Sequence, residues 1–208
     1  MMVVKVGGAV VGSELGELED AVVVHGGGPQ ISAELERRGI VATFIRGRRV
    51  TDAETLAVVR EVLLDVNAQL CAAIGPRAIG LAGDEIGLAA THVPELGFVG
   101  DPLPTAPQAV LDALAAGRIP VVAPLATGPL NVNADEMAAA LAVGLGADRI
   151  VFLTDVPGVM LPRIGADEAD RLLNDGTFEG GIVPKLTAAV SAARKGVRAE
   201  IGMTEVVA

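Results

Sequence analysis

Residues 21–29 read Ala-Val-Val-Val-His-Gly-Gly-Gly-Pro, an apolar run that ends in three glycines and a proline. A short run of β-branched residues followed by glycine is typical of a strand buried on both faces. Helical periodicity then extends over residues 29–38. A strand, a glycine turn and a helix in this order predict a parallel sheet, in which ligands bind where the strands end.

The beginning of the chain repeats this pattern. Residues 2–6 are Met-Val-Val-Lys-Val, and Gly7 and Gly8 follow them. Such turns let backbone N–H groups approach an anion, so two of them side by side predict a cradle for a polyanion. Tight-turn packing explains either turn equally well when it is considered alone. Neither turn has the spacing of a Walker A motif or of a dinucleotide-binding loop.

Strands and helices continue to alternate along the chain. Further strands are expected at residues 77–81, 119–123, 149–153 and 198–201, the last of these completing the set. Helices are expected at residues 51–73, 106–116, 133–145, 167–174 and 183–195, with a hairpin or lid within residues 83–101. The alternation predicts an α/β fold, a three-layer sandwich with a mostly parallel central sheet.

The helix over residues 51–73 carries two separate expectations. Thr51 and Glu54 have the spacing of a capping box, which predicts that the helix begins at Thr51. Its apolar positions exceed what one core face requires. Burial deep inside the domain explains this excess, and so does a twofold partner. We expect a homodimer that forms through this helix.

The composition restricts the possible partners. The 208 residues carry a net charge of −10, which is unsuited to nonspecific binding of nucleic acid or of anionic membranes. No apolar run is long enough to span a membrane, so we expect small-molecule substrates and a cytoplasmic location. The single cysteine, Cys71, excludes an internal disulfide and a cysteine-rich zinc site, and no protein-built metal site is expected.

Two lysines occupy positions that are unfavourable for an unpaired cation. Lys5 lies within an apolar strand, where burial is costly unless the ammonium group meets an anion. Lys185 stands at the start of a helix, where the helix dipole disfavours positive charge. Both positions point to an anionic ligand. The alternatives are a lysine that reaches solvent from a strand end and an ordinary surface lysine.

Polar residues also gather before the apolar helix at residues 133–145. Asn133 is a good N-cap with Glu136 at the N3 position, so a structural role accounts for both. It does not account for Asn131 or Asp135. Dipole stabilisation explains Asp135 if its side chain is exposed, whereas the functional interpretation is a carboxylate that positions nearby lysines.

Seven ordered segments resemble the amino acid kinase family. They are KVGG at 5–8, VHGGGP at 24–29, RVTD at 49–52, GLAGD at 80–84, NVNAD at 131–135, LTDVPGV at 153–159 and GIVPK at 181–185. Each segment alone is weak, but their order spans nearly the whole chain. Within the family, the sequence is most similar to the members that act on acetylglutamate.

The resemblance implies phosphorylation of the side-chain carboxylate of N-acetyl-L-glutamate by ATP, in arginine biosynthesis, with Mg²⁺ held mainly by the nucleotide. It implies that Lys5 and Lys185 stabilise charge on the transferred group and that Asp135 orients both lysines. Arg49 and Asn131 would hold the substrate α-carboxylate. The other implied site residues are Gly26, Gly27 and Asn133 for the substrate and Gly7, Gly8, Thr154, Asp155 and Gly181 for phosphate or nucleotide.

The family pattern also implies two lobes that share one continuous sheet. Residues 1–146 would bind the acceptor and form the dimer, and residues 147–208 would form a shortened nucleotide-binding lobe. A kinase of carrier-linked aminoadipate or glutamate in lysine biosynthesis is an open alternative. A catalytically weak domain that binds a ligand for regulation is another.

Overall fold

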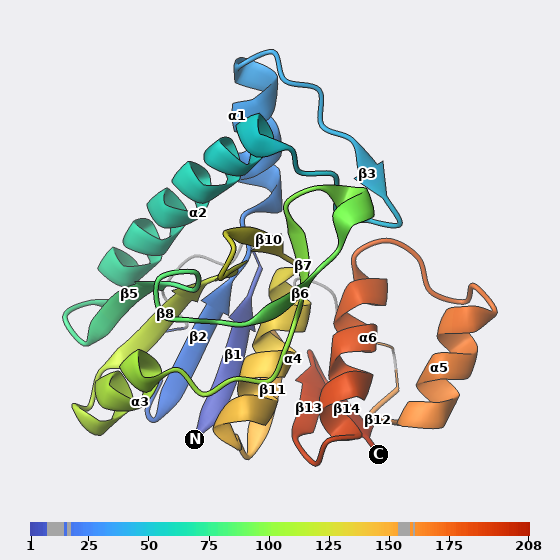
Figure 1. Cartoon of the computed structure of the whole chain (residues 1–208). Coiled ribbons are helices and arrows are strands. Elements are labelled where there is room, and N and C mark those ends of the chain that lie inside the picture. The colour runs from blue at the N-terminus through green and yellow to red at the C-terminus, as the bar shows by residue number, and fades with distance from the viewer. Residues whose placement is uncertain (8–14, 16–17, 154–158, 160) are drawn as a thin grey trace.

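The computed structural model describes residues 1–7, 15, 18–153, 159 and 161–208, and its central feature is a twisted sheet (Figure 1). Within these residues, eight strands lie in the order β12-β14-β13-β11-β1-β2-β8-β5. Their bounds are β1 (Met2–Val6), β2 (Ala21–His25), β5 (Ala78–Ala82), β8 (Ile119–Ala123), β11 (Arg149–Leu153), β12 (Arg163–Gly165), β13 (Arg198–Ile201) and β14 (Thr204–Val207). Each neighbouring pair is parallel except β13 and β14, which confirms the mostly parallel sheet.

Helices cover both faces of this sheet, because successive residues of a strand point to opposite faces. On one face, Val4 and Val23 pack in the same cluster as Leu70 of α2 (Ala53–Ile74), above which lies α1 (Gly28–Arg37). On the other face, Val3 and Val22 share a cluster with residues of α3 (Gln108–Ala115), α4 (Ala134–Leu145) and α6 (Ile182–Ala193). The predicted three-layer sandwich is therefore confirmed. Helix α5 (Ala166–Asn174) lies beside α6 at the end of the molecule near β12 (Figure 1).

The hairpin predicted within residues 83–101 is also present. Strands β6 (Ala90–His92) and β7 (Val99–Pro102) pair antiparallel around a short 3₁₀ helix, η2 (Pro94–Leu96). They join β9 (Leu125–Ala126) and β10 (Leu130–Val132) in a second, four-stranded sheet. A separate small hairpin, β3 (Phe44–Ile45) with β4 (Arg48–Arg49), projects above the end of the central sheet (Figure 1).

One expectation about the central sheet was wrong, because β13 is not the last strand. Strand β14 follows it after a turn at Gly202, whose φ of 56° is readily adopted by glycine. Strand β14 pairs antiparallel with β13 and parallel with β12, which was also not predicted. Strand β12 has three residues and pairs with β14, which is distant in sequence, and β14 has only four residues, so local periodicity indicates both strands poorly.

The expected start of α2 was also wrong. The N-cap is Asp52, whose carboxylate accepts a hydrogen bond from the Thr55 backbone N–H at 2.8 Å. Thr51 is fully buried, and its hydroxyl bonds to groups outside the helix. An aspartate caps a helix as well as a threonine does, and it adds a favourable charge at the positive end of the dipole. The helix therefore begins at Ala53.

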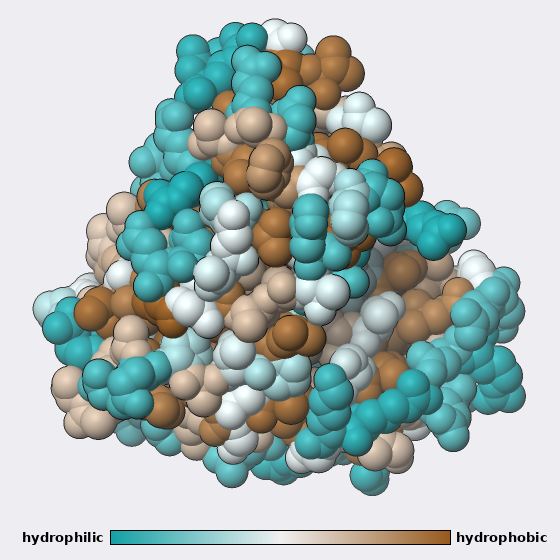
Figure 2. All heavy atoms as spheres, in the orientation of Figure 1, coloured by the Kyte–Doolittle hydropathy of each residue, from teal (hydrophilic) through white to brown (hydrophobic). Residues whose placement is uncertain are grey.

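The excess apolar residues of α2 are mostly buried by the chain itself. Its buried apolar positions are Leu56, Val58, Val59, Val62, Leu63 and Leu70. Burial within the domain is therefore sufficient to explain the pattern, and the homodimer stays a prediction. Among the described residues, no helix has the length and apolar character that crossing a bilayer requires. On the face shown in Figure 2, hydrophilic and hydrophobic residues are interspersed, with hydrophilic ones gathered along α5.

Candidate active site

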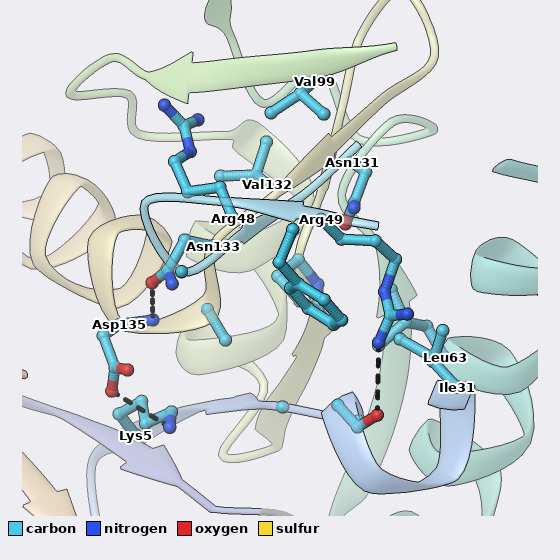
Figure 3. Close-up of a pocket in the computed structure, with 17 residues that line it drawn as sticks. Lys5, Ile31, Arg48, Arg49, Leu63, Val99, Asn131, Val132, Asn133 and Asp135 are labelled. Atoms are coloured by element: carbon cyan, nitrogen blue, oxygen red, sulfur yellow. Dashed lines mark hydrogen bonds and ion pairs between the residues drawn. The ribbon is translucent and has the colours of Figure 1, made fainter. Parts of the chain in front are cut away.

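A cavity of about 250 Å³ lies at the carboxyl ends of β1 and β2, beneath the β3–β4 hairpin (Figure 3). Its lining comes mainly from β1, the glycine turn after β2, the β3–β4 hairpin, β10 and the start of α4, with single residues from α1, α2 and β7 and before β9. The location agrees with the expectation that ligands bind where the strands of the sheet end. Seven of the residues proposed from the sequence line it: Lys5, Gly26, Gly27, Arg49, Asn131, Asn133 and Asp135.

One carboxylate at the edge of the cavity holds two ammonium groups. Lys5 Nζ lies 3.0 Å from Asp135 Oδ1, and Lys185 Nζ lies 3.7 Å from Asp135 Oδ2. Lys5 points toward α4 because it has the same strand parity as Val3, whose side chain faces that helix. Lys185 lies in the first turn of α6, so the expected anion near it is Asp135 itself. The three residues predicted to be catalytic are therefore in contact.

The local structure of α4 fixes the position of Asp135. Asn133 is the N-cap, and its Oδ1 accepts hydrogen bonds from the backbone N–H groups of Asp135 and Glu136 at 2.9 and 3.1 Å. This confirms the predicted capping role of Asn133. Asp135 is only 5% exposed, so its interpretation as an exposed residue that merely stabilises the helix dipole is wrong. The carboxylate lies between the helix N-terminus and the two lysines.

Burial changes the acidity of Lys5. The side chain is almost fully enclosed, and this desolvation lowers the pKa of Lys5 below that of an ordinary lysine. The Asp135 carboxylate opposes the decrease, whereas the nearby Lys185 adds to it. Asp135 therefore stabilises the charged form of Lys5, and a bound anion near Lys5 would do the same.

Arg49 presents an unpaired part of its guanidinium group in the cavity. Its Nη2 donates to Ser32 Oγ at 2.9 Å and to the Gly28 carbonyl at 3.4 Å, and its guanidinium lies 4.6 Å from the centre of the Phe44 ring. Its Nη1 is buried, and no hydrogen-bond acceptor contacts it within the described part of the chain. A buried, unpaired cationic donor is costly. A carboxylate in the cavity would satisfy it.

Asn131 lies across the cavity from the glycine turn (Figure 3). Its Nδ2 donates to the hydroxyl of Thr51 at 3.1 Å. No donor contacts its Oδ1 among the residues whose positions are described. The amide is therefore anchored at one end and available at the other.

The glycines of the site contribute in different ways. The Gly26 N–H donates to the Val6 carbonyl at 3.0 Å, so Gly26 provides space beside Lys5 and no free donor. A Cβ on Gly27 would lie 3.0 Å from a Leu63 methyl carbon, which shows how closely α2 approaches this turn. Gly7 directly follows β1, and Gly181 is the N-cap of α6, with its carbonyl 3.2 Å from Lys185 Nζ. Gly8, Thr154 and Asp155, for which phosphate or nucleotide binding was predicted, lie outside the described residues.

His25, the last residue of β2, has a structural position beside the glycine turn. It is 1% exposed, and burial lowers its pKa. Asn67 Nδ2 bonds to the Val121 carbonyl at 2.8 Å and approaches His25 Nε2 at 3.1 Å, so Nε2 acts as an acceptor. The proton then resides on Nδ1, which lies 3.0 Å from the Gly26 carbonyl. The neutral ring ties the turn to α2.

Sequence reasoning missed Ser32 and Phe44, which hold the two sides of the Arg49 guanidinium. Ser32 occupies the first turns of α1, directly after the glycine-rich turn, and this position was the available signal. Phe44 is half-exposed on β3 despite its apolar ring. Nothing in its local sequence distinguishes it from a core residue.

Comparison with known proteins gives consistent results along the whole chain. Residues 1–202 match the family model described as the amino acid kinase family. Acetylglutamate kinases from Cereibacter sphaeroides and Methanopyrus kandleri are each 40% identical to the chain. The first alignment covers 97% of this chain and 79% of the relative, and the second covers 95% and 92%. A solved structure from Streptococcus mutans superimposes with a TM-score of 0.86 at 27% identity, over 99% of this chain and 98% of the other.

Proposed function

The chain belongs to the amino acid kinase family, and from this premise we propose that it phosphorylates the side-chain carboxylate of N-acetyl-L-glutamate with ATP. The product is an acyl phosphate, and the enzyme is a phosphotransferase with a carboxyl group as acceptor, acting in arginine biosynthesis. The support for this substrate is the 40% identity to acetylglutamate kinases over nearly the whole chain. The observation that carries the reaction type is the pair of lysines held by Asp135 at the edge of the cavity.

The chemistry requires positive charge between two anions. An oxygen of the acceptor carboxylate forms a bond to the γ-phosphorus, the bond from that phosphorus to the bridging oxygen breaks, and ADP leaves. Catalysis of such transfers rests mostly on positioning and electrostatic stabilisation. Two ammonium groups from β1 and α6 supply the charge, and Asp135 fixes their separation. A carboxylate is already ionised at neutral pH, so no general base is needed.

The other end of the acceptor is assigned to Arg49. Its buried, unpaired Nη1 fits the α-carboxylate, because a guanidinium recognises a carboxylate through parallel hydrogen bonds. Asn131, Asn133, Gly26 and Gly27 complete the proposed acceptor site around the cavity. The alternative acceptor, a carrier-linked aminoadipate or glutamate, would need the same two groups at its reacting carboxylate but has no support from the names of the relatives above.

The nucleotide is assigned to the region where α6 begins. Gly7 and Gly181 leave space for phosphates near Lys185, and Gly8, Thr154 and Asp155 remain proposed contacts. Both oxygens of Asp135 face lysines, so we propose that Mg²⁺ arrives on the nucleotide, where it neutralises phosphate charge. Residues 1–146 would then be the acceptor lobe and residues 147–208 the nucleotide lobe. The central sheet contains strands from both.

Trapping the acyl phosphate with hydroxylamine tests this proposal. The protein, ATP and Mg²⁺ are incubated with N-acetyl-L-glutamate, with free glutamate or with aminoadipate, and the hydroxamate is measured. We expect hydroxamate with N-acetyl-L-glutamate only, and none when ATP is omitted. A stronger signal with aminoadipate would favour the alternative acceptor. Calorimetric binding of ATP without hydroxamate from any acceptor would favour a ligand-binding regulatory domain instead.

Replacement of Arg49 should mainly weaken substrate binding. We expect Arg49→Ala to raise the KM for acetylglutamate roughly tenfold to a hundredfold, the range for losing a hydrogen bond to a charged group. The turnover number should fall much less, because the α-carboxylate does not change charge during the reaction. Steady-state kinetics give both values. The matched control is Arg46→Ala, which removes an exposed arginine from the same hairpin. A fall in the turnover number of roughly tenfold or more with an unchanged KM would contradict the assignment of Arg49 to the α-carboxylate.

A homodimer through α2 and a cytoplasmic location remain proposals. Leu64 of α2 is only partly buried, and Ala57, Ala68 and Ala72 are exposed on the same side of the helix, so a narrow apolar strip is available for a partner. Light scattering at micromolar concentration should give twice the chain mass of 21.0 kDa. A mass of one chain at that concentration would exclude the dimer.

A further inference from the structure

Thr51 has a buried hydroxyl group that helix capping does not explain. Its side chain is 0% exposed, and Asp52 caps α2 in its place. The Thr51 hydroxyl lies 2.9 Å from the Arg49 carbonyl and 3.1 Å from Asn131 Nδ2. It therefore connects the two residues assigned to the substrate. A buried hydroxyl that bonds to two proposed substrate-binding residues is well placed to position them.

The hydrogen bonds of Thr51 determine which end of the Asn131 amide faces it. A hydroxyl has one proton, and the Arg49 carbonyl can only accept, so that proton is directed to the carbonyl. From Asn131 the hydroxyl can then only accept a hydrogen bond. The amide nitrogen must face Thr51, and the amide oxygen must face away from it. The orientation of this amide thus follows from donor and acceptor accounting.

The backbone of Thr51 is itself fixed, so its hydroxyl has a defined position. Its N–H donates to the Leu96 carbonyl at 2.8 Å, and its carbonyl accepts from the Phe98 N–H at 2.7 Å. A Cβ on Gly97 would lie 2.3 Å from the Thr51 carbonyl oxygen, so the two segments are in close backbone contact. These bonds attach Thr51 to the end of η2 and to the loop that leads into β7, the strand that pairs with β10.

We propose that Thr51 is a positioning residue that holds Asn131 so that its Oδ1 accepts a hydrogen bond from an N–H group of the substrate. This inference rests on the proposed function and refines it. The resemblance to the family placed Asn131 on the α-carboxylate, but a carbonyl oxygen repels a carboxylate. The acylated amino group of the acceptor carries one N–H donor next to that carboxylate. Arg49 then binds the carboxylate while Asn131 binds the amide N–H.

An acceptor analogue that lacks this single hydrogen tests the proposal. In 2-acetoxyglutarate an ester oxygen replaces the amide N–H of N-acetylglutamate, and the shape is nearly the same. The kcat/KM of the wild type should be at least roughly tenfold higher for N-acetylglutamate than for 2-acetoxyglutarate. In the ester, an oxygen atom faces Asn131 Oδ1, so two acceptors replace one hydrogen bond. In Thr51→Val, which keeps the shape but removes the hydroxyl, Asn131 is free to rotate. The preference should then fall to about threefold or less.

Thr51→Ser is the matched control, because it keeps the hydroxyl and should keep the preference. Thermal unfolding of each variant separates lost positioning from lost stability. If Thr51→Val does not fold, Asn131→Ala is tested in its place. This variant lacks Oδ1, so it should lose the preference for N-acetylglutamate over 2-acetoxyglutarate. If Thr51→Val or Asn131→Ala keeps the wild-type preference, the inference is wrong, whereas the proposed function still stands. If the wild type phosphorylates neither compound, the proposed function fails and the inference fails with it.

Discussion

Lys185→Ala and Lys5→Met should each lower the turnover number of the kinase roughly a hundredfold to a thousandfold, the usual effect of losing one preorganised donor to developing charge. The KM for acetylglutamate should change by no more than a few fold. Both ammonium groups adjoin Asp135 at the edge of the cavity, where charge grows on the transferred group. An interaction that strengthens along the reaction affects turnover more than binding.

The two lysine variants differ in what else they disturb. Lys185 keeps some exposure to solvent, so its replacement should leave the stability nearly unchanged. Lys5 is buried, and methionine fills its volume while the ion pair is lost, so thermal unfolding must accompany the kinetics. Lys195→Ala is the matched control, because it removes an exposed lysine just beyond the end of α6. If both active-site variants keep their turnover within about threefold of the wild type, the two lysines are not the source of the electrostatic stabilisation.

Asp135→Asn should lower turnover as strongly as loss of either lysine, and it should also destabilise the protein. The variant leaves Lys5 buried without its partner, a change that typically costs about 3–5 kcal/mol when one member of a buried ion pair is removed. Deprotonation of Lys5 relieves part of that cost. Chemical denaturation at neutral pH measures the change. The control is Asp167→Asn, which changes a fully exposed carboxylate paired with Arg194. It should leave the turnover number and the free energy of unfolding unchanged.

The pH dependence of the same variant gives a second measurement. Burial already lowers the pKa of Lys5, and Asp135 opposes that decrease. Without the carboxylate the pKa falls further, so the catalytic ammonium loses its proton at lower pH. The alkaline decline of turnover should therefore shift to lower pH in Asp135→Asn. The stability penalty is largest while Lys5 is protonated in the native state. It decreases as pH rises from the lowered native pKa toward the unfolded value. If the alkaline decline of turnover occurs at the same pH in Asp135→Asn as in the wild type, the protonation of Lys5 does not control the reaction.

Much of the fold and part of the site followed from local sequence. The bounds of β1, β2, β8 and β11 were predicted as they occur, because short apolar runs that end at glycine, proline or polar residues define buried strands. The start of α4 followed from Asn133, whose side chain caps the helix in the predicted way. The unfavourable position of Lys5 in an apolar strand also indicated that an anion must be near it.

The chain order alone could not show which groups meet. Asp135 is separated from Lys5 by 130 positions and from Lys185 by 50, and only the packing of α4 on β1 and of α6 on α4 brings the three together. Strand β12 likewise depends on a partner distant in sequence, β14. Thr51 has the local pattern of a helix cap, yet its hydroxyl bonds to Arg49 and Asn131. Periodicity and capping rules describe interactions over a few residues. The partners of a buried polar group depend instead on which segments the tertiary structure places within hydrogen-bonding distance.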